Sequence, residues 1–267
     1  MNNKSIGIFD SGLGGLTVVS ELRRVLPGED IVYFGDTGRV PYGTRSRETI
    51  ERYARQDIDF LLGQDVKFII AACGTVSSVA AHVGDGLPVP FAGVVNPAAI
   101  AAANITKNDK IGVLGTTATI GSKAYEKALH NINPKYQVFS QNCPLFVPIV
   151  ETGWTSPDDE ITRLTTRRYL ADIKAAEVDT LILGCTHYPL ISDIISDEMG
   201  ESVTLINAGK EVADYAAKVI ERDDLLNDGG TGRVKFFVTD KPTGFIKTAE
   251  ILLGRKIDDN ITQVEIG

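Results

Sequence analysis

Cysteine and histidine are scarce in this sequence, with three of each among 267 residues. The cysteines, Cys73, Cys143 and Cys185, are odd in number and far apart. They therefore do not predict the disulfide framework of a small secreted domain. No Cys-x-x-Cys pair occurs, which disfavours thioredoxin-like redox chemistry. We expect free thiols in a reducing compartment.

Long apolar runs are also lacking, since none reaches the roughly 20 residues of a membrane-spanning helix. Near the start, only Ile6–Phe9 is mainly apolar before Asp10, which is too short for the apolar region of a signal peptide. The sequence thus predicts a cytoplasmic protein with no membrane partner. Positive charge is in deficit as well, because the net charge is −8. That balance argues against nucleic acid as a partner.

What the sequence does contain is a regular alternation of short apolar runs and helix-length amphipathic segments. This alternation is typical of an α/β fold with parallel sheets. The segments 35–46 and 143–154 carry turn residues and are predicted loops. The predicted strands are Ile6–Phe9, Ile31–Phe34, Phe68–Ala72, Phe91–Val95, Ile111–Leu114, Gln137–Ser140, Thr180–Leu183, Val203–Ile206, Val234–Thr239 and Ile261–Val264. The predicted helices are Gly14–Val25, Arg47–Leu62, Val76–Val83, Pro97–Ala103, Ile120–His130, Pro157–Ala176, Tyr188–Ser196, Lys210–Glu221 and Gly244–Leu253.

Two pairs of similar segments indicate an internal duplication. Ile6–Phe9 recurs as Ile111–Leu114, 105 positions later, and Cys73 recurs as Cys185, 112 positions later. Nearly equal offsets favour a duplicated α/β unit, with halves near 1–96 and 105–206. A duplication would place equivalent strand ends on opposite walls of one cleft.

Both Cys73 and Cys185 directly follow a predicted buried strand. Ligands of open α/β sheets bind beyond the carboxyl ends of the strands. A helix is predicted after each cysteine, and its N-terminus would lower the thiol pKa below about 8.5. We therefore favour functional thiols over two alternatives. One is a pair of buried cysteines that only pack, and the other is a zinc site with His187, which lacks the usual paired ligand spacing.

Two further residues are candidates for the same site: His187, close to Cys185, and Asp10, at the end of the first predicted strand. His187 follows Cys185 by two positions and would act as a general acid or stabilise a thiolate. Asp10 ends the first strand, before a glycine-rich turn that lacks the lysine of a phosphate-binding loop. It is either a helix cap or a carboxylate at the pocket rim. We interpret Cys143 as structural. Glu151 is either a pocket carboxylate or a surface residue, and we favour the surface position.

These residues stand in motifs that resemble the glutamate racemase family, the cofactor-independent amino-acid racemases that supply D-glutamate for bacterial peptidoglycan and cell shape. The motifs follow the family order from the first strand to residue 190. They are Gly7–Thr17, Tyr33–Gly43, Ala72–Cys73, Gly112–Thr119, Cys143–Pro148 and Leu183–Leu190.

The resemblance implies two pseudo-symmetric, doubly wound α/β domains with the active site in the cleft between them. The first domain would comprise residues 1–97 and 208–267, and the second residues 98–207. It also implies an isomerase that needs no cofactor or metal, has glutamate as its small-molecule partner and forms a homodimer.

The resemblance further implies that two thiols act on opposite faces of the substrate. Cys73 would act on D-glutamate with the help of Asp10, and Cys185 on L-glutamate with the help of His187. The residues that match substrate-binding or pocket positions are Asp10, Ser11, Pro41, Tyr42, Gly43, Gly74, Thr75, Thr186 and His187.

One residue departs from the family pattern. The family usually has asparagine after the first cysteine, where this chain has Gly74. We predict weaker substrate binding than in a relative with asparagine, and a lower KM in the Gly74→Asn variant. Two other functions stay open. One is a related racemase, such as an aspartate racemase, and the other is a catalytically impaired binding protein of the same fold.

Overall fold

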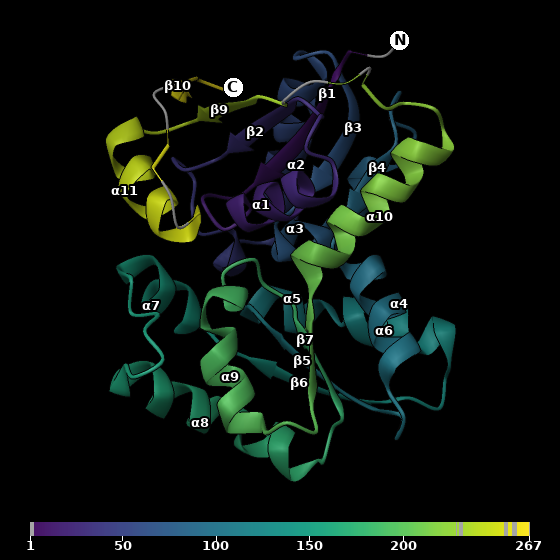
Figure 1. Cartoon of the computed structure of the whole chain (residues 1–267), viewed down its shortest axis with the longest axis vertical. Helices are drawn as coiled ribbons and strands as arrows, with labels where there is room; N and C mark the ends of the chain where they lie inside the picture. Colours follow the sequence, from purple (N-terminus) through teal and green to yellow (C-terminus); the bar gives the residue numbers. More distant parts are fainter. Residues whose placement is uncertain (1–2, 228, 230–231, 254–255, 258–260, 267) are drawn as a thin grey trace.

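The computed structural model describes residues 3–227, 229, 232–253, 256–257 and 261–266. The described chain contains two β-sheets, which lie one above the other in Figure 1. The upper sheet contains β1 (Ser5–Asp10), β2 (Ile31–Gly35), β3 (Val66–Ala71), β4 (Phe91–Gly93), β9 (Val234–Val238) and β10 (Ile261–Gln263). The lower sheet contains β5 (Lys110–Gly115), β6 (Gln137–Asn142), β7 (Thr180–Leu183) and β8 (Thr204–Asn207).

Every predicted strand forms, and every strand pair is parallel. The predicted α/β class with two domains is therefore confirmed. The helices are α1 (Leu16–Val25), α2 (Arg47–Leu62), α3 (Gly74–Val79), α4 (Val95–Ile105), α5 (Thr117–Ser122), α6 (Ala124–Ile132), α7 (Phe146–Thr152), α8 (Glu160–Ala175), α9 (Ser192–Met199), α10 (Ala208–Arg222) and α11 (Pro242–Leu253). Short 3₁₀ turns are η1 (Tyr42–Thr44), η2 (Ala81–Gly84) and η3 (Tyr188–Ile191). In the part of the chain that is described, none of the helices combines the length and apolar character of a membrane span.

The two sheets share one topology. The strand order is β2-β1-β3-β4 within the upper sheet and β6-β5-β7-β8 in the lower one. Gly7 pairs with Ile69 between β1 and β3, and Gly112 pairs with Leu181 between β5 and β7. Cys73 lies four positions after Ile69, and Cys185 lies four positions after Leu181. The two cysteines therefore lie at equivalent positions beyond the ends of β3 and β7. β9 and β10 extend the upper sheet beyond β2.

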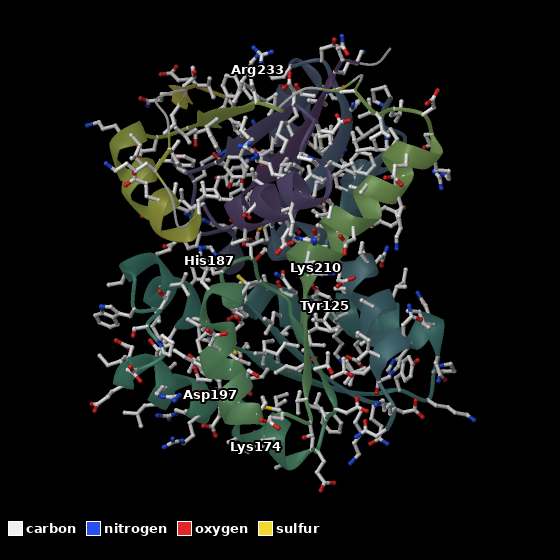
Figure 2. The ribbon with its side chains drawn as sticks, in the orientation of Figure 1. Tyr125, Lys174, His187, Asp197, Lys210 and Arg233 are labelled. Atoms are coloured by element: carbon white, nitrogen blue, oxygen red, sulfur yellow. The ribbon has the colours of Figure 1, made fainter. Side chains whose placement is uncertain are left out.

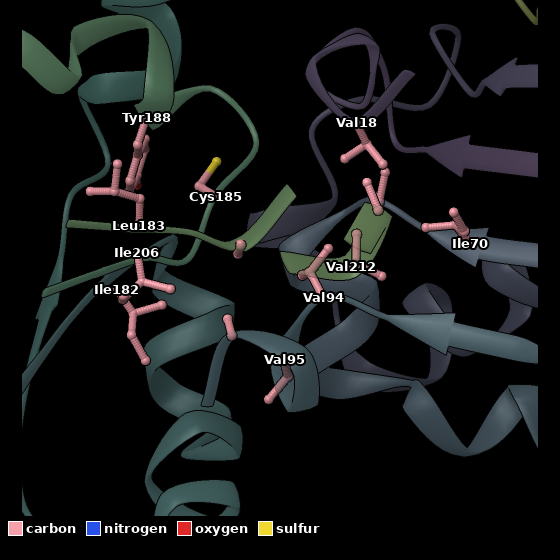
Figure 3. Packing of buried hydrophobic residues seen from close by; sticks show 14 of the residues in the cluster. Val18, Ile70, Val94, Val95, Ile182, Leu183, Cys185, Tyr188, Ile206 and Val212 are labelled. Atoms are coloured by element: carbon pink, nitrogen blue, oxygen red, sulfur yellow. The ribbon is translucent and has the colours of Figure 1, made fainter. Parts of the chain in front are cut away.

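The chain passes between the sheets through α4 and returns through α10. One cluster of buried apolar residues continues across this passage. Figure 3 shows Val94, Val95 and Val212 between Ile182 of the lower sheet and Ile70 of the upper one. The two domains are therefore joined by packed core rather than by a bare linker.

The predicted loop 143–154 is wrong, because it contains α7. Phe146, Ile149 and Val150 recur at helical spacing and are all buried. Pro148 lies in the first turn of the helix, where a missing N–H costs no hydrogen bond. Gly153, with φ of 86°, ends the helix in the left-handed conformation. The prolines that suggested a loop are thus compatible with a short helix.

Two predicted helices are interrupted. The segment 120–130 is divided into α5 and α6 by Lys123, whose φ is 57°. The helix predicted over 76–83 ends at Val79 and is followed by η2. Apolar periodicity continues across such breaks and does not report the backbone angle of one residue. The predicted domain boundaries also cover residues 1–2, 228, 230–231, 254–255, 258–260 and 267, which lie outside the described residues.

Candidate active site

A cavity of about 400 Å³ lies between the two domains, at the carboxyl ends of their strands. Its walls include Cys73 after β3 and Cys185 after β7, as the duplication predicts. Figure 2 labels His187 at the boundary between the two halves of the molecule. All site residues predicted from the sequence line this cavity, namely Asp10, Ser11, Pro41, Tyr42, Gly43, Cys73, Gly74, Thr75, Cys185, Thr186 and His187.

On the first wall, the Cys73 thiol is buried and donates to the Ser11 Oγ at 3.5 Å. Burial raises the pKa of Cys73 to about 12, and the nearby charge of Asp10 adds to the increase. The sequence-based expectation of a lowered pKa is wrong for this thiol. The helix that follows, α3, has only six residues, and its dipole does not offset the loss of water around the sulfur.

Asp10 is itself buried, with 2% of its surface exposed. Its Oδ1 accepts a hydrogen bond from the Gly12 N–H at 2.9 Å. Burial raises the pKa of Asp10, although the charge of His187 and the backbone N–H groups of Gly12 and Gly15 oppose that increase. The carboxyl group is therefore held at the rim of the cavity by the glycine-rich turn.

On the second wall, Cys185 Sγ lies 3.7 Å from His187 Nδ1. The other ring nitrogen, Nε2, lies 3.1 Å from Glu151 Oε1. Burial alone would lower the pKa of His187, but its contacts with Cys185 and Glu151 outweigh this effect and raise the pKa to about 10. The imidazole is therefore a cation at neutral pH.

Glu151 is not the isolated surface residue that we expected. Its side chain is 42% exposed, yet it lines the cavity and contacts His187. Glu151 lies in α7, within the segment predicted to be a loop. The available signal was a carboxylate directly after the buried Val150, near the end of a run with helical apolar spacing.

Close contacts between the domains frame the cavity. Thr17 Oγ1 donates to the Thr186 carbonyl oxygen at 3.1 Å. The hydroxyls of Thr75 and Thr116 lie 3.1 Å apart. Gly14 faces His187 so closely that a Cβ there would lie 2.6 Å from the imidazole ring. The glycine therefore allows the ring to reach its position beside Cys185.

A family model described as Asp/Glu/Hydantoin racemase matches residues 14–216. This chain belongs to that racemase family. A glutamate racemase from Geobacter metallireducens is 46% identical over 258 residues, covering 96% of this chain and 95% of the relative. Among solved structures, a glutamate racemase isoform from Bacillus anthracis has a TM-score of 0.94 at 38% identity, covering 99% of this chain and 98% of that one.

A second similar solved structure contains a bound ligand. It is the glutamate racemase from Francisella tularensis in complex with D-glutamate, with a TM-score of 0.92 at 37% identity. The match covers 99% of this racemase and 98% of that chain. The resemblance inferred from the motifs is thus confirmed over nearly the whole length.

Behind the Pro41–Gly43 wall of this racemase lies a buried polar network that the sequence analysis missed. Arg39 Nε lies 2.6 Å from Asp36 Oδ2, and its NH2 group lies 3.1 Å from Asp57 Oδ1. The Tyr42 hydroxyl contacts both carboxyl groups. Asp57 lies on the buried face of α2, and a carboxylate among apolar helix positions was the available signal.

This network holds more negative charge than positive charge. Burial first, and then the charge of Asp36, raises the pKa of Asp57 well above its usual range. The Tyr42 hydroxyl lies 3.1 Å from Asp57 Oδ2 and also contacts Asp36 Oδ2. The network ties α2 to η1 and thereby fixes the cavity wall formed by Tyr42.

Replacing Tyr42 by phenylalanine is expected to lower the free energy of unfolding by about 1–3 kcal/mol, because two buried carboxyl groups lose a shared partner. Urea denaturation measures this change. Tyr53→Phe is the matched control, since the Tyr53 ring packs on Tyr42 with centroids 5.3 Å apart. A Tyr42→Phe variant as stable as the Tyr53→Phe variant would contradict the expectation.

Cys143 also lines the cavity, beside Pro144. Its thiol is fully buried and donates to the Gln141 carbonyl at 3.7 Å. Burial raises the pKa of Cys143, and the proximity of Cys185 adds to that increase. The group is therefore a neutral thiol, and its assignment as structural stays a prediction. Within the described residues, no cluster of three or more His, Cys, Asp or Glu side chains is arranged to hold a metal ion.

Proposed function

We propose that this racemase interconverts L- and D-glutamate by proton transfer between its two cysteines and the substrate α-carbon. The observation that carries the proposal is that Cys73 and Cys185 line one cavity from different domains. Relatives that cover nearly the whole chain are named glutamate racemases. The cavity of about 400 Å³ suits a small amino acid.

The chemistry needs a base and an acid on opposite faces of the α-carbon at the same moment. One thiolate removes the α-proton, and the electron pair stays on the carbon and its carboxylate as a carbanion. The opposite thiol then donates its proton to the other face, so the two cysteines exchange protonation states in each turnover. Preorganised donors and exclusion of water stabilise the carbanion. Ser11, Thr75 and Thr186 line the cavity, and their hydroxyls would bind the substrate carboxylates.

The two walls differ in charge, which supports different roles for the two thiols. The Asp10 carboxyl stands beside the Cys73 wall, and the protonated His187 stands beside Cys185. Cys185, assisted by His187 and Glu151, would remove the proton of L-glutamate. Cys73, assisted by Asp10, would remove the proton of D-glutamate.

The domain boundaries, the cellular role and the oligomeric state are also proposed. The two sheets support a first domain of residues 1–97 and 208–267 and a second domain of residues 98–207, with the crossings in α4 and α10. The bacterial relatives support a cytoplasmic role in supplying D-glutamate for peptidoglycan. We further propose a homodimer, which sedimentation equilibrium would test.

Incubation with L-glutamate in deuterated water tests the function. We expect optical rotation to fall to zero and deuterium to appear at the α-carbon, because the proton delivered comes from a solvent-exchanged thiol. The same assay with L-aspartate is the comparison. Exchange with aspartate and none with glutamate would overturn the substrate assignment, and exchange with neither would favour a binding protein of the same fold.

Replacing Glu151 by glutamine is expected to lower the pKa of His187 from about 10, because one of the two partners that raise it loses its charge. The alkaline limb of the kcat profile should move to lower pH. NMR titration measures the imidazole directly, since the chain has only three histidines. Glu160→Gln, at an exposed position of α8, is the control for net charge.

The raised pKa of the His187 imidazole also makes the free energy of unfolding depend on pH. The folded pKa of His187 lies above its ordinary value of about 6.5. Its protonation therefore contributes fully to stability below that value, and the contribution is lost as the pH rises towards 10. An imidazole pKa in the Glu151→Gln variant equal to that of the Glu160→Gln control would contradict the assigned contact.

A further inference from the structure

The turn between β1 and α1 carries two groups that act on the Cys73 thiol. The Cys73 thiol donates to the Ser11 Oγ at 3.5 Å, and the charge of Asp10 acts on the same sulfur. Between these two residues and the start of α1 lies Gly12, whose N–H donates to Asp10 Oδ1 at 2.9 Å. The position of Gly12 therefore affects how the turn presents both side chains to the thiol.

Gly12 is held in turn by β2. The Tyr33 side chain is fully buried, and its hydroxyl donates to the Gly12 carbonyl oxygen at 3.0 Å. The same oxygen lies so close to β2 that a Cβ at Gly35 would be 2.5 Å from it. A series of contacts thus runs from the Tyr33 hydroxyl through Gly12 to the Asp10 carboxyl group.

The C-terminal strand and helix of the upper domain fix the Tyr33 ring. Phe236 of β9 and Phe245 of α11 pack against it, with ring centroids 6.1 and 6.3 Å away. The two phenylalanine rings also pack on each other at 6.0 Å. All three rings are buried, and Figure 1 shows α11 on the β9 side of the upper domain. Because a closely packed ring has little freedom to rotate, the hydroxyl is directed at Gly12 before a substrate binds.

The lower domain has a different residue at the equivalent position. Tyr33 pairs with Ile8 of β1. In the lower sheet, Ser140 pairs with Val113, the residue equivalent to Ile8. Ser140 is exposed, and its side chain is much shorter than that of tyrosine. The support from Tyr33 is therefore specific to the Cys73 wall of the cavity and departs from the similarity of the two domains.

We propose that Tyr33 is a positioning residue for proton transfer at Cys73. Its hydroxyl holds the Gly12 carbonyl, which keeps the Gly12 N–H on Asp10 and the neighbouring Ser11 Oγ beside the thiol. The inference rests on the proposed function, in which the Cys73 thiolate removes the α-proton of D-glutamate and leaves the electron pair on the substrate. In the opposite direction the Cys73 thiol returns a proton to that carbanion.

Tyr33→Phe removes the hydroxyl and keeps the packed ring. We expect kcat/KM to fall about tenfold, the scale of one lost hydrogen bond to a buried group. The equilibrium constant of a racemisation is one, so kcat/KM should fall equally from D- and from L-glutamate. Tyr136→Phe is the matched control and should keep the wild-type kcat/KM. The Tyr136 hydroxyl also donates to a backbone carbonyl, that of Ala103 at 3.2 Å, but Tyr136 does not line the substrate cavity.

Deuterium isotope effects on kcat/KM identify the proton transfer that has slowed. In Tyr33→Phe, α-deuterated D-glutamate should give a large effect, because Cys73 removes its deuteron in the slow step. α-Deuterated L-glutamate should give a clearly smaller effect, because Cys185 removes its deuteron before the slow step and reversibly. An isotope effect is a ratio of rates and does not depend on the fraction of folded enzyme, so a loss of stability alone would not separate the two values.

Two results would overturn the inference. One is a kcat/KM in Tyr33→Phe equal to that in Tyr136→Phe, and the other is an isotope effect from L-glutamate as large as that from D-glutamate. Either result, with a wild type that racemises glutamate, would defeat the role of Tyr33 and leave the proposed function intact. A wild type that exchanges no deuterium at the glutamate α-carbon would defeat the proposed function, and the inference would fall with it.

Discussion

Serine in place of either Cys73 or Cys185 is expected to lower kcat for racemisation by about 10²–10⁴-fold, the usual contribution of a positioned acid or base. A hydroxyl is a far weaker acid than a thiol, so the variant lacks a usable base on one face. Since each turnover uses both cysteines, both reaction directions should fail together. Polarimetry from L- and from D-glutamate measures this result.

The third cysteine supplies the control for that experiment. Cys143 shares the cavity and is buried, but the proposed chemistry gives it no proton to carry. Cys143→Ala should keep kcat within a few-fold of the wild type, and a modest stability loss of about 1 kcal/mol is typical of such a change. Full activity in Cys73→Ser or Cys185→Ser would exclude the two-thiol mechanism, and so would an equal loss in Cys143→Ala.

A side chain at position 74 is expected to reduce kcat/KM by about 100-fold, the scale of a misplacement of about 1 Å at a reacting centre. A Cβ on Gly74 would collide with the Gly184 carbonyl oxygen and lie 3.7 Å from the Cα of Cys185. The obstacle is backbone of the other domain, which cannot rotate away as a side chain can. Gly74→Ala and Gly74→Asn should therefore both push the two cysteine walls apart.

This expectation reverses the one drawn from sequence, in which Gly74→Asn lowers the KM for glutamate by restoring the family residue. Gly121→Ala is the matched control, because it also adds a methyl group to a helical glycine but has nothing within 4 Å of its Cβ. Thermal unfolding of each variant separates a displaced wall from an unfolded chain. A Gly74→Asn variant with a KM below that of the wild type would restore the sequence-based expectation.

The strands and their terminal residues could be predicted because they depend on local patterns. β2, β3 and β7 are buried along their whole length in parallel sheets, and strands buried on both faces read as continuous apolar runs in the sequence. The repeats of Ile6–Phe9 at Ile111–Leu114 and of Cys73 at Cys185 indicated two equivalent sheets, and the strand orders confirm them. The duplication in turn placed Cys73 and Cys185 at equivalent strand ends.

Other features depend on contacts between distant residues. The pKa of Cys73 is set by burial, which opposes the helix effect that the sequence suggested. The His187–Glu151 pair joins residues 36 positions apart, through a short helix whose prolines resemble those of a loop. Neither can be deduced from the order of residues, because burial and proximity are properties of the packed chain.

The sequence by itself therefore determined the α/β class, the duplication, the family and the two cysteines, since each is encoded in residue type and spacing along one segment. Only the tertiary structure decided how closely the domains approach. Gly74 was visible as a departure from the family pattern, but its steric consequence lies in Gly184, 110 positions away in the other domain.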